Sequence, residues 1–201
     1  MLESIPFAAG LLCVTALLAG FAATALRDDY RFWPAGSDER KRRLYLFCTR
    51  AFLLSTLLTV VFDAGSAPLP LWSRGVSGVT VVLALVLLSK SAFDLGEKET
   101  EGRVGELRTD GLYRYTRNPQ NLGYIVLFWA IAGSSASLLA TILAGYITLC
   151  LVIQSFIEEP WLRTQYDGYA DYASTVPRFI GIRSVRRVVT TIQSDEKAAD
   201  S

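Results

Sequence analysis

The sequence of 201 residues contains no histidine, and this absence excludes several kinds of site. A histidine general base, a Ser–His–Asp triad and a histidine-ligated metal or haem all need an imidazole. The three cysteines, Cys13, Cys48 and Cys150, lie within apolar runs and lack the spacing of metal ligands or of a disulfide framework. We therefore expect no metal site, and we interpret the cysteines as small buried apolar residues.

Charge is missing from long stretches of the chain. The runs 5–26 and 122–157 carry no charged side chain, and the runs 44–62 and 68–88 carry one arginine each. Hydrophobic residues make up 51% of the sequence, and the mean hydropathy is +0.32. Because a transmembrane helix needs about 20 apolar residues to cross roughly 30 Å of hydrocarbon, this pattern excludes an ordinary soluble domain and predicts an integral membrane protein.

The last apolar run, 122–157, is too long for one crossing, since it would measure about 54 Å as a straight helix. The cluster Gly133-Ser134-Ser135 interrupts it, and such small residues favour a break. We predict helices over 119–132 and 136–157 joined as a tight hairpin, the first being short. With the three earlier runs, the expected fold is an all-α bundle of about five transmembrane helices.

The basic residues predict how the bundle is oriented. Lysine and arginine gather in 27–43, in 90–117 and after 157, whereas the N-terminus and the connection 63–70 have almost none. By the positive-inside rule the N-terminus lies outside, and the polar segments and the C-terminus are cytoplasmic. No basic residue precedes the run 5–26, so we expect a retained helix rather than a cleaved signal peptide.

The chain shows no internal repeat and no separate soluble domain. We expect three transmembrane helices in 1–92, then a loop, the hairpin and a polar segment in 93–182. The remainder, 183–201, is basic and ends in SDEKAADS, which is typical of a disordered tail. The basic residues near the membrane favour anionic lipids, and no nucleic-acid partner is expected.

Two polar stretches flank the predicted hairpin, namely RTDGLYRYTRNPQNLGY at 108–124 and IEEPWLRTQYDGYADYASTVPRF at 157–179. A tight hairpin brings its two ends together, so Glu158 and Glu159 should lie near the first stretch. Pro119 suits a first helical turn, and Asn118 before it can cap that helix. The simplest interpretation is a helix start at the membrane surface, with arginines on phosphate headgroups.

Glu158 and Glu159 need a further explanation, because carboxylates near the end of a helix oppose its dipole. They could pair with Arg114, Arg117 or Arg163, which would make them structural. They could instead hold a cationic or hydroxyl-rich ligand.

The order of these motifs resembles a known family. LRTDGLYRYTRNPQNLGY, an apolar hairpin, EEPWL, paired tyrosines and VPRF together are similar to the isoprenylcysteine carboxyl methyltransferases and their phospholipid methyltransferase relatives. The resemblance covers about 105–179. It implies an integral membrane enzyme that uses S-adenosylmethionine to methylate an N, O or S nucleophile on a lipophilic or lipid-modified acceptor. It assigns no catalytic residue, and it implies a cofactor pocket made by Glu106, Leu107, Arg108, Tyr113, Asn118, Pro119, Gln120, Asn121 and Glu158.

The sequence departs from the family pattern at three of these motif positions. Asn118 stands where the family has histidine and Asn121 where it usually has tyrosine; asparagine can bind a ligand but cannot carry a proton. Gln154 replaces a substrate-contacting arginine of the prenylcysteine enzymes, which argues against a prenylcysteine carboxylate as acceptor. Gln154 and Arg50 are the candidate acceptor-binding residues, although Arg50 could instead extend to the membrane surface.

Two other functions stay open at this point. Membrane sterol reductases, which use NADPH, resemble the same C-terminal motif but are usually much longer. A non-catalytic membrane protein that kept the fold is the other alternative, and Asn118 and Asn121 are the residues that favour it.

Overall fold

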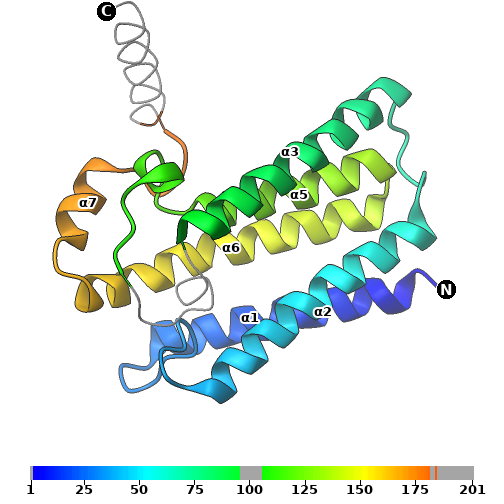
Figure 1. Cartoon of the computed structure of the whole chain (residues 1–201). Helices are drawn as coiled ribbons and strands as arrows, with labels where there is room; N and C mark the ends of the chain where they lie inside the picture. Colours follow the sequence, from blue (N-terminus) through cyan, green and yellow to red (C-terminus); the bar gives the residue numbers. More distant parts are fainter. Residues whose placement is uncertain (1, 96–105, 182–183, 185–201) are drawn as a thin grey trace, which may run out of the picture.

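The computed structural model describes residues 2–95, 106–181 and 184. Within these residues the chain is helical and contains no strand, and the long helices lie side by side (Figure 1). Much of the predicted cytoplasmic loop and nearly all of the predicted disordered tail lie outside the described residues. In chain order the helices are α1 (Ser4–Leu26), α2 (Glu39–Asp63), α3 (Leu71–Leu95), the short 3₁₀ helix η1 (Gly111–Arg114), α5 (Pro119–Ser135), α6 (Leu138–Gln165) and α7 (Tyr169–Thr175).

The predicted membrane bundle is confirmed. Among the described residues, α1, α2, α3 and α6 are each long and apolar enough to cross a membrane. The fifth long helix, α5, has 17 residues, which is at the lower limit of about 17–25 residues for a crossing. The prediction of about five spans with a short fourth one therefore becomes four full-length helices with α5 packed among them.

The predicted hairpin is also confirmed, with its turn slightly later than expected. The helix α5 continues through the Gly133-Ser134-Ser135 cluster, and the chain reverses at Ala136 and Ser137. Ala136 adopts a left-handed conformation with φ of 50°. Ser137 then caps α6, because its hydroxyl accepts a hydrogen bond from the Ala140 amide at 3.0 Å.

The end of α6 was predicted incorrectly. The helix was expected to stop at 157, but it continues through Pro160 to Gln165. Glu158 and Glu159 therefore lie inside the helix rather than at its end, so the argument from the helix dipole does not apply to them. The buried side chains of Glu159 and Trp161 give this polar extension a packed face, which the end of the apolar run did not reveal.

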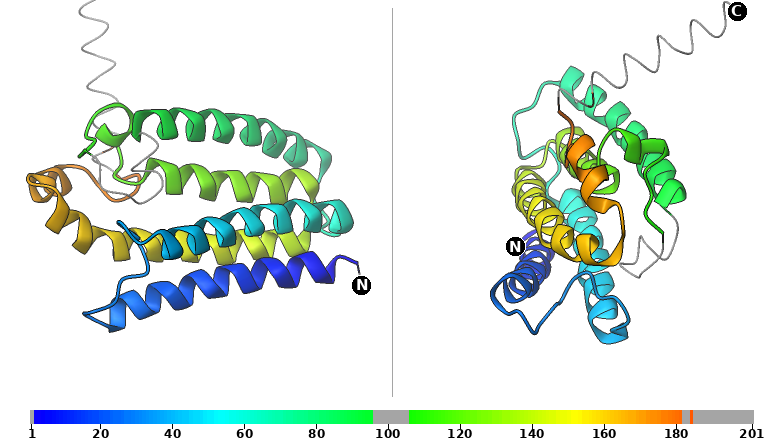
Figure 2. Two further views of the ribbon diagram at one scale, coloured as in Figure 1. Left: turned by 60° about the horizontal axis from the view of Figure 1, so that its bottom comes forward. Right: turned by 90° about the vertical axis from the view of Figure 1, so that its left-hand side faces the viewer.

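The helices do not all pack against their neighbours in sequence. The helix α3 packs on α5, while α2 packs on α1 and α6, and α5 packs on α6. Although α2 and α3 follow each other in sequence, they form no packed pair over their described residues. Figure 2 shows α5 between them in the left-hand view.

The connection between α2 and α3 is fixed to the turn of the hairpin. The amide of Gly65 donates to the carbonyl of Ser135 at 2.9 Å, and the amide of Ala67 donates to that of Ala136 at 2.8 Å. The Asp63 carboxylate accepts from the Ser137 hydroxyl at 2.6 Å. These bonds join α2, α3, α5 and α6 at the end of the bundle where the N-terminus of the chain lies (Figure 1).

The loop 27–38 between α1 and α2 folds back onto α1. Phe32 is buried, and its ring lies 6.1 Å from that of Phe21 between centroids. Gly20 makes this possible, because a Cβ at that position would lie 2.4 Å from the Phe32 ring. The packing of Phe32 places the next residue, Trp33, in a buried position at the other end of the bundle.

Replacing Gly20 with alanine is expected to lower the free energy of unfolding by about 1–3 kcal/mol, since the added methyl group overlaps the Phe32 ring. Gly145→Ala is the matched control, because a Cβ there meets nothing within 4 Å. Thermal unfolding in detergent micelles measures both. A midpoint for the Gly20 variant equal to that of the wild type would contradict this packing.

Candidate functional site

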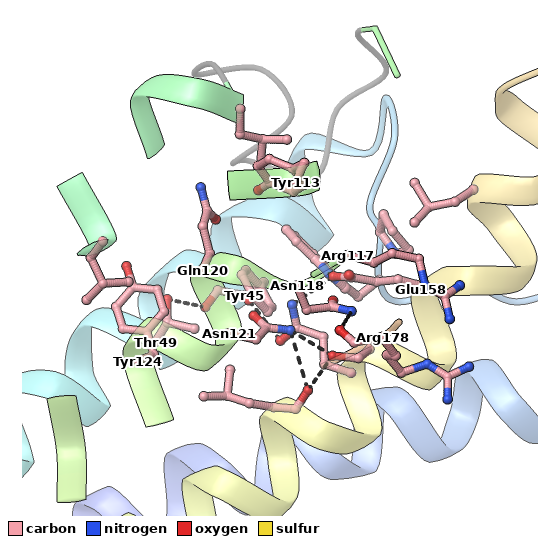
Figure 3. Close-up of a pocket in the computed structure, with 18 of the residues that line it drawn as sticks. Tyr45, Thr49, Tyr113, Arg117, Asn118, Gln120, Asn121, Tyr124, Glu158 and Arg178 are labelled. Carbon is pink, nitrogen blue, oxygen red and sulfur yellow. Dashed lines mark hydrogen bonds between the residues drawn. The ribbon is translucent and has the colours of Figure 1, made fainter. Parts of the chain in front are cut away.

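A cavity of about 530 Å³ lies between α2 and α3, with α5 and α6 forming its inner wall (Figure 3). This volume is within the range of about 300–1,000 Å³ that is usual for small-molecule sites. The segment 106–108, η1 and α7 border one end of it. The lining contains every site residue predicted from the sequence, including Arg50 and Gln154, except Pro119, which is buried at the start of α5.

The cavity has a polar end and an apolar end. Charged and aromatic side chains line the polar end: Glu106, Arg108, Tyr113, Arg117, Glu158, Tyr169, Tyr172 and Arg178. Apolar side chains from the long helices line much of the remainder: Phe52, Leu53, Leu85, Leu88, Leu127, Phe128 and Ile147. Thr49, Arg50 and Ser89 also line this part of the cavity. Such an arrangement suits a polar ligand at one end and a lipophilic one at the other.

Glu158 presents a partly unused carboxylate to the polar end. Its Oε1 atom accepts hydrogen bonds from the indole N–H of Trp33 and, at 2.7 Å, from the amide of Gln154. Among the described residues, no hydrogen bond reaches its other oxygen, Oε2. Oε2 is therefore free to accept a hydrogen bond from a ligand.

Glu159, the next residue, is used for structure. Its side chain is buried and pairs with Arg117 and Arg178, and more loosely with Arg163 at 3.6 Å. Pairing with Arg114, Arg117 or Arg163 was one of the two alternatives for the glutamates, and for Glu159 the structure shows it with Arg117 and Arg163. Arg178 was not anticipated as a partner. The adjacent glutamates thus divide the two interpretations: both line the cavity, but Glu159 is paired with arginines, whereas Glu158 keeps one oxygen without a partner among the described residues.

Three arginines that line the cavity each leave one donor unused. The Nε atoms of Arg108, Arg117 and Arg178 are buried and have no hydrogen-bond partner among the described residues. All three side chains line the cavity. A buried N–H without a partner is costly, so these groups fit a ligand that brings an acceptor such as a carboxylate.

Asn118 and Asn121 bind other parts of the protein. Asn118 precedes α5, but its side chain makes no cap; its Nδ2 donates instead to the carbonyl of Arg178 at 3.0 Å. Asn118 occupies the N-cap position as predicted, but the prediction that its side chain caps the helix is wrong, because the bond to Arg178 holds the amide where its oxygen accepts from no first-turn N–H. The Nδ2 of Asn121 donates to the Ser155 hydroxyl at 3.0 Å and joins α5 to α6.

Gly123 allows α3 to approach α5 closely. A Cβ at Gly123 would lie 2.8 Å from Leu88. The small side chain of glycine therefore serves helix packing at this position, because the neighbour is another helix.

The tyrosines form an aromatic wall at the polar end. Tyr113 is buried, and its carbonyl accepts from the Tyr172 hydroxyl at 2.7 Å. The rings of Tyr169 and Tyr172 meet edge to face, with centroids 5.9 Å apart. Burial raises the pKa of the Tyr113 phenol. Tyr113 is therefore neutral at physiological pH and can act as a hydrogen-bond donor.

The two candidate acceptor-binding residues, Gln154 and Arg50, differ in their surroundings. Gln154 accepts from the Tyr45 hydroxyl at 3.1 Å and donates to Glu158, so both ends of its amide are occupied. Arg50 is exposed on α2 and lines the cavity.

Sequence reasoning missed Trp33, Tyr45 and Arg178. Trp33 lies in a polar loop 125 residues from Glu158, and no local pattern links them. Arg178 belongs to the VPRF motif that carried part of the resemblance, so that motif was the available signal.

Comparison with known proteins gives one match. The model of the phospholipid methyltransferase family matches residues 72–168. This segment contains α3, α5, α6 and the cavity residues between them, while Trp33, Tyr45 and Arg50 lie before it. No curated protein and no solved structure matches the chain. The segment 72–168, which forms one wall of the cavity and holds Glu158, is thus similar to the phospholipid methyltransferase family.

Proposed function

We propose that the protein is a methyltransferase that uses S-adenosylmethionine to methylate an N, O or S nucleophile on a lipophilic acceptor. The observation that carries the proposal is the cavity itself, in which a polar end with unused donors and acceptors continues into an apolar end. The family of the segment 72–168 supports methyl transfer. The distribution of basic residues supports a cytoplasmic position for the polar end.

The groups at the polar end are those that the cofactor would need. S-adenosylmethionine contains a sulfonium, an ammonium, a carboxylate and a ribose diol. Oε2 of Glu158 can accept from the ammonium or the diol, and the buried Nε groups of Arg108, Arg117 and Arg178 can donate to the carboxylate. The tyrosine faces attract a cation such as the sulfonium.

The chain contributes alignment in this proposal. When bound, the cofactor supplies a methyl group that is already activated for transfer, so the protein needs no acid–base group to activate the donor. Holding two reactants at near-attack distance contributes about 7–11 kcal/mol to lowering a barrier. Asn118 is compatible with this role, because it holds the Arg178 segment against α5 without exchanging a proton.

In this proposal, the acceptor binds in the apolar end of the cavity, between α2 and α3. These helices do not pack on each other, and the leucine and phenylalanine side chains between them match a lipid chain. Arg50 lies on this side of the cavity and can bind an anionic group of the acceptor.

Replacing Arg50 with alanine is expected to raise the apparent KM for the acceptor about tenfold with little change in kcat, because it removes one charged contact. Arg50→Lys should restore part of the loss. Methyl incorporation into a membrane lipid extract, dispersed in detergent at increasing concentrations, measures the effect. Arg43→Ala is the control, since Arg43 lies on the same helix but does not line the cavity. An unchanged KM in Arg50→Ala would show that Arg50 only reaches the membrane surface.

Calorimetry of the purified protein in detergent tests the proposed function. Binding of S-adenosylhomocysteine without binding of NADPH supports the methyltransferase. Binding of NADPH alone would favour a reductase, and binding of neither would favour a non-catalytic protein.

A further inference from the structure

The residues that hold Glu158 in place come largely from outside the family segment. Trp33 is 3% exposed and belongs to the loop 27–38, and Tyr45 belongs to α2. Both precede the matched residues 72–168. Their contacts with the cavity are therefore a feature of this chain that the family match does not describe.

Glu158 and three other side chains form a closed ring of contacts. The Trp33 indole N–H and the Gln154 amide both donate to Oε1 of Glu158, the latter at 2.7 Å. The other end of the Gln154 amide accepts from the Tyr45 hydroxyl at 3.1 Å. The ring closes where Tyr45 stacks on Trp33, with centroids 3.6 Å apart and an interplanar angle of 15°.

This ring fixes which carboxylate oxygen faces the cavity. A glutamate side chain has several rotatable bonds, and holding it in one rotamer has an entropic cost at the moment of binding. Two donors on one oxygen remove that freedom before a ligand arrives, and they leave Oε2 as the oxygen without a partner among the described residues. Bonds from N–H groups to a carboxylate are stronger than neutral ones, so the arrangement is well held.

We propose that Trp33 and Tyr45 are positioning residues, which orient Glu158 so that its Oε2 accepts a hydrogen bond from the cofactor. The loop 27–38 and α2 thereby complete a binding site whose remaining parts lie in the family segment. This inference rests on the proposed function, because it assigns the ligand of Glu158 as S-adenosylmethionine.

The test compares two tryptophan variants by calorimetry with S-adenosylhomocysteine. Trp33→Phe keeps a ring to stack on Tyr45 but removes the indole N–H, and it should raise the Kd about tenfold, as expected for one bond to a charged group. Trp129→Phe is the matched control, since Trp129 also loses an indole hydrogen bond, to Thr148 at 3.1 Å, away from the cavity. Its Kd should equal that of the wild type.

A double-mutant cycle separates positioning from a purely structural role. If Trp33 acts through Glu158, Trp33→Phe should add little to the loss already caused by Glu158→Gln. Fully additive losses would overturn the inference. Tyr45→Phe provides a second variant, expected to raise the Kd about threefold by releasing Gln154; it carries the test if Trp33→Phe does not fold.

The outcomes distinguish this inference from the proposed function. If the wild type does not bind S-adenosylhomocysteine, the proposed function fails, and the inference fails with it. If the wild type binds and the folded Trp33 and Tyr45 variants bind equally well, only the inference is overturned.

Discussion

Replacing Glu158 with glutamine is expected to weaken the binding of S-adenosylhomocysteine by at least about 100-fold, which corresponds to losing one partner of a desolvated charged contact. Glutamine keeps the size of the side chain, and its carbonyl can still accept from Trp33 and Gln154. It then turns an N–H group toward the position where the ligand needs an acceptor. The loss of binding should therefore come without a large loss of stability.

Calorimetry measures the expected loss of binding, and thermal unfolding of the same preparation checks that stability is retained. Asp167→Asn is the control, because it also removes a carboxylate close in sequence to Glu158, but from an exposed position that does not line the cavity. Its effect on the Kd should be within a factor of about three. A Glu158 variant that binds as well as this control would show that the Glu158 carboxylate does not contact the ligand.

Replacing Glu159 with alanine should instead reduce stability. Its carboxylate is 6% exposed and holds Arg117 and Arg178 together. Removing it leaves two guanidinium groups unpaired in a buried position, which costs about 3–5 kcal/mol. Since a protein of this size is stable by only about 5–15 kcal/mol, the variant is expected to unfold at a much lower temperature.

Arg163→Ala supplies the comparison for this stability effect. Arg163 contacts the same carboxylate at 3.6 Å, but its side chain is 49% exposed, so its loss should cost only about 0–1 kcal/mol. Similar unfolding midpoints for the Glu159 and Arg163 variants would contradict the structural role of the buried cluster. Glu159 would then not be the structural member of the pair of glutamates.

The features that follow from local pattern were predicted well from the sequence. Uncharged runs predicted the membrane helices, and Gly133-Ser134-Ser135 predicted the hairpin, because hydrocarbon thickness and chain reversal leave direct marks on composition. The hairpin in turn predicted that Glu159 lies near Arg117. These steps need only residues that are close in sequence or joined by one turn.

The features that depend on distant contacts were not predicted. The helix α6 continues past 157 because Glu159 and Trp161 find buried partners, and Asn118 turns away from its own helix toward Arg178, 60 residues later. The contact between Trp33 and Glu158 joins residues that are 125 positions apart. The predicted cofactor contacts themselves remain predictions, although the structure gathers nearly all of those residues around one cavity.

The anchored connection holds α2 and α3 together at one end of the bundle, while the cavity lies between them toward the other end. The joint lies at the loop 64–70, where backbone bonds tie it to the hairpin turn, and the far ends of α2 and α3 flank the cavity at the opposite end. A helix of the length of α2 is about 37 Å long, so a tilt of about 5° at the joint displaces the far end by about 3 Å. Small rotations near the joint are thus amplified at the far ends of α2 and α3, where the proposed acceptor would pass between the helices, while the distance across the joint hardly changes.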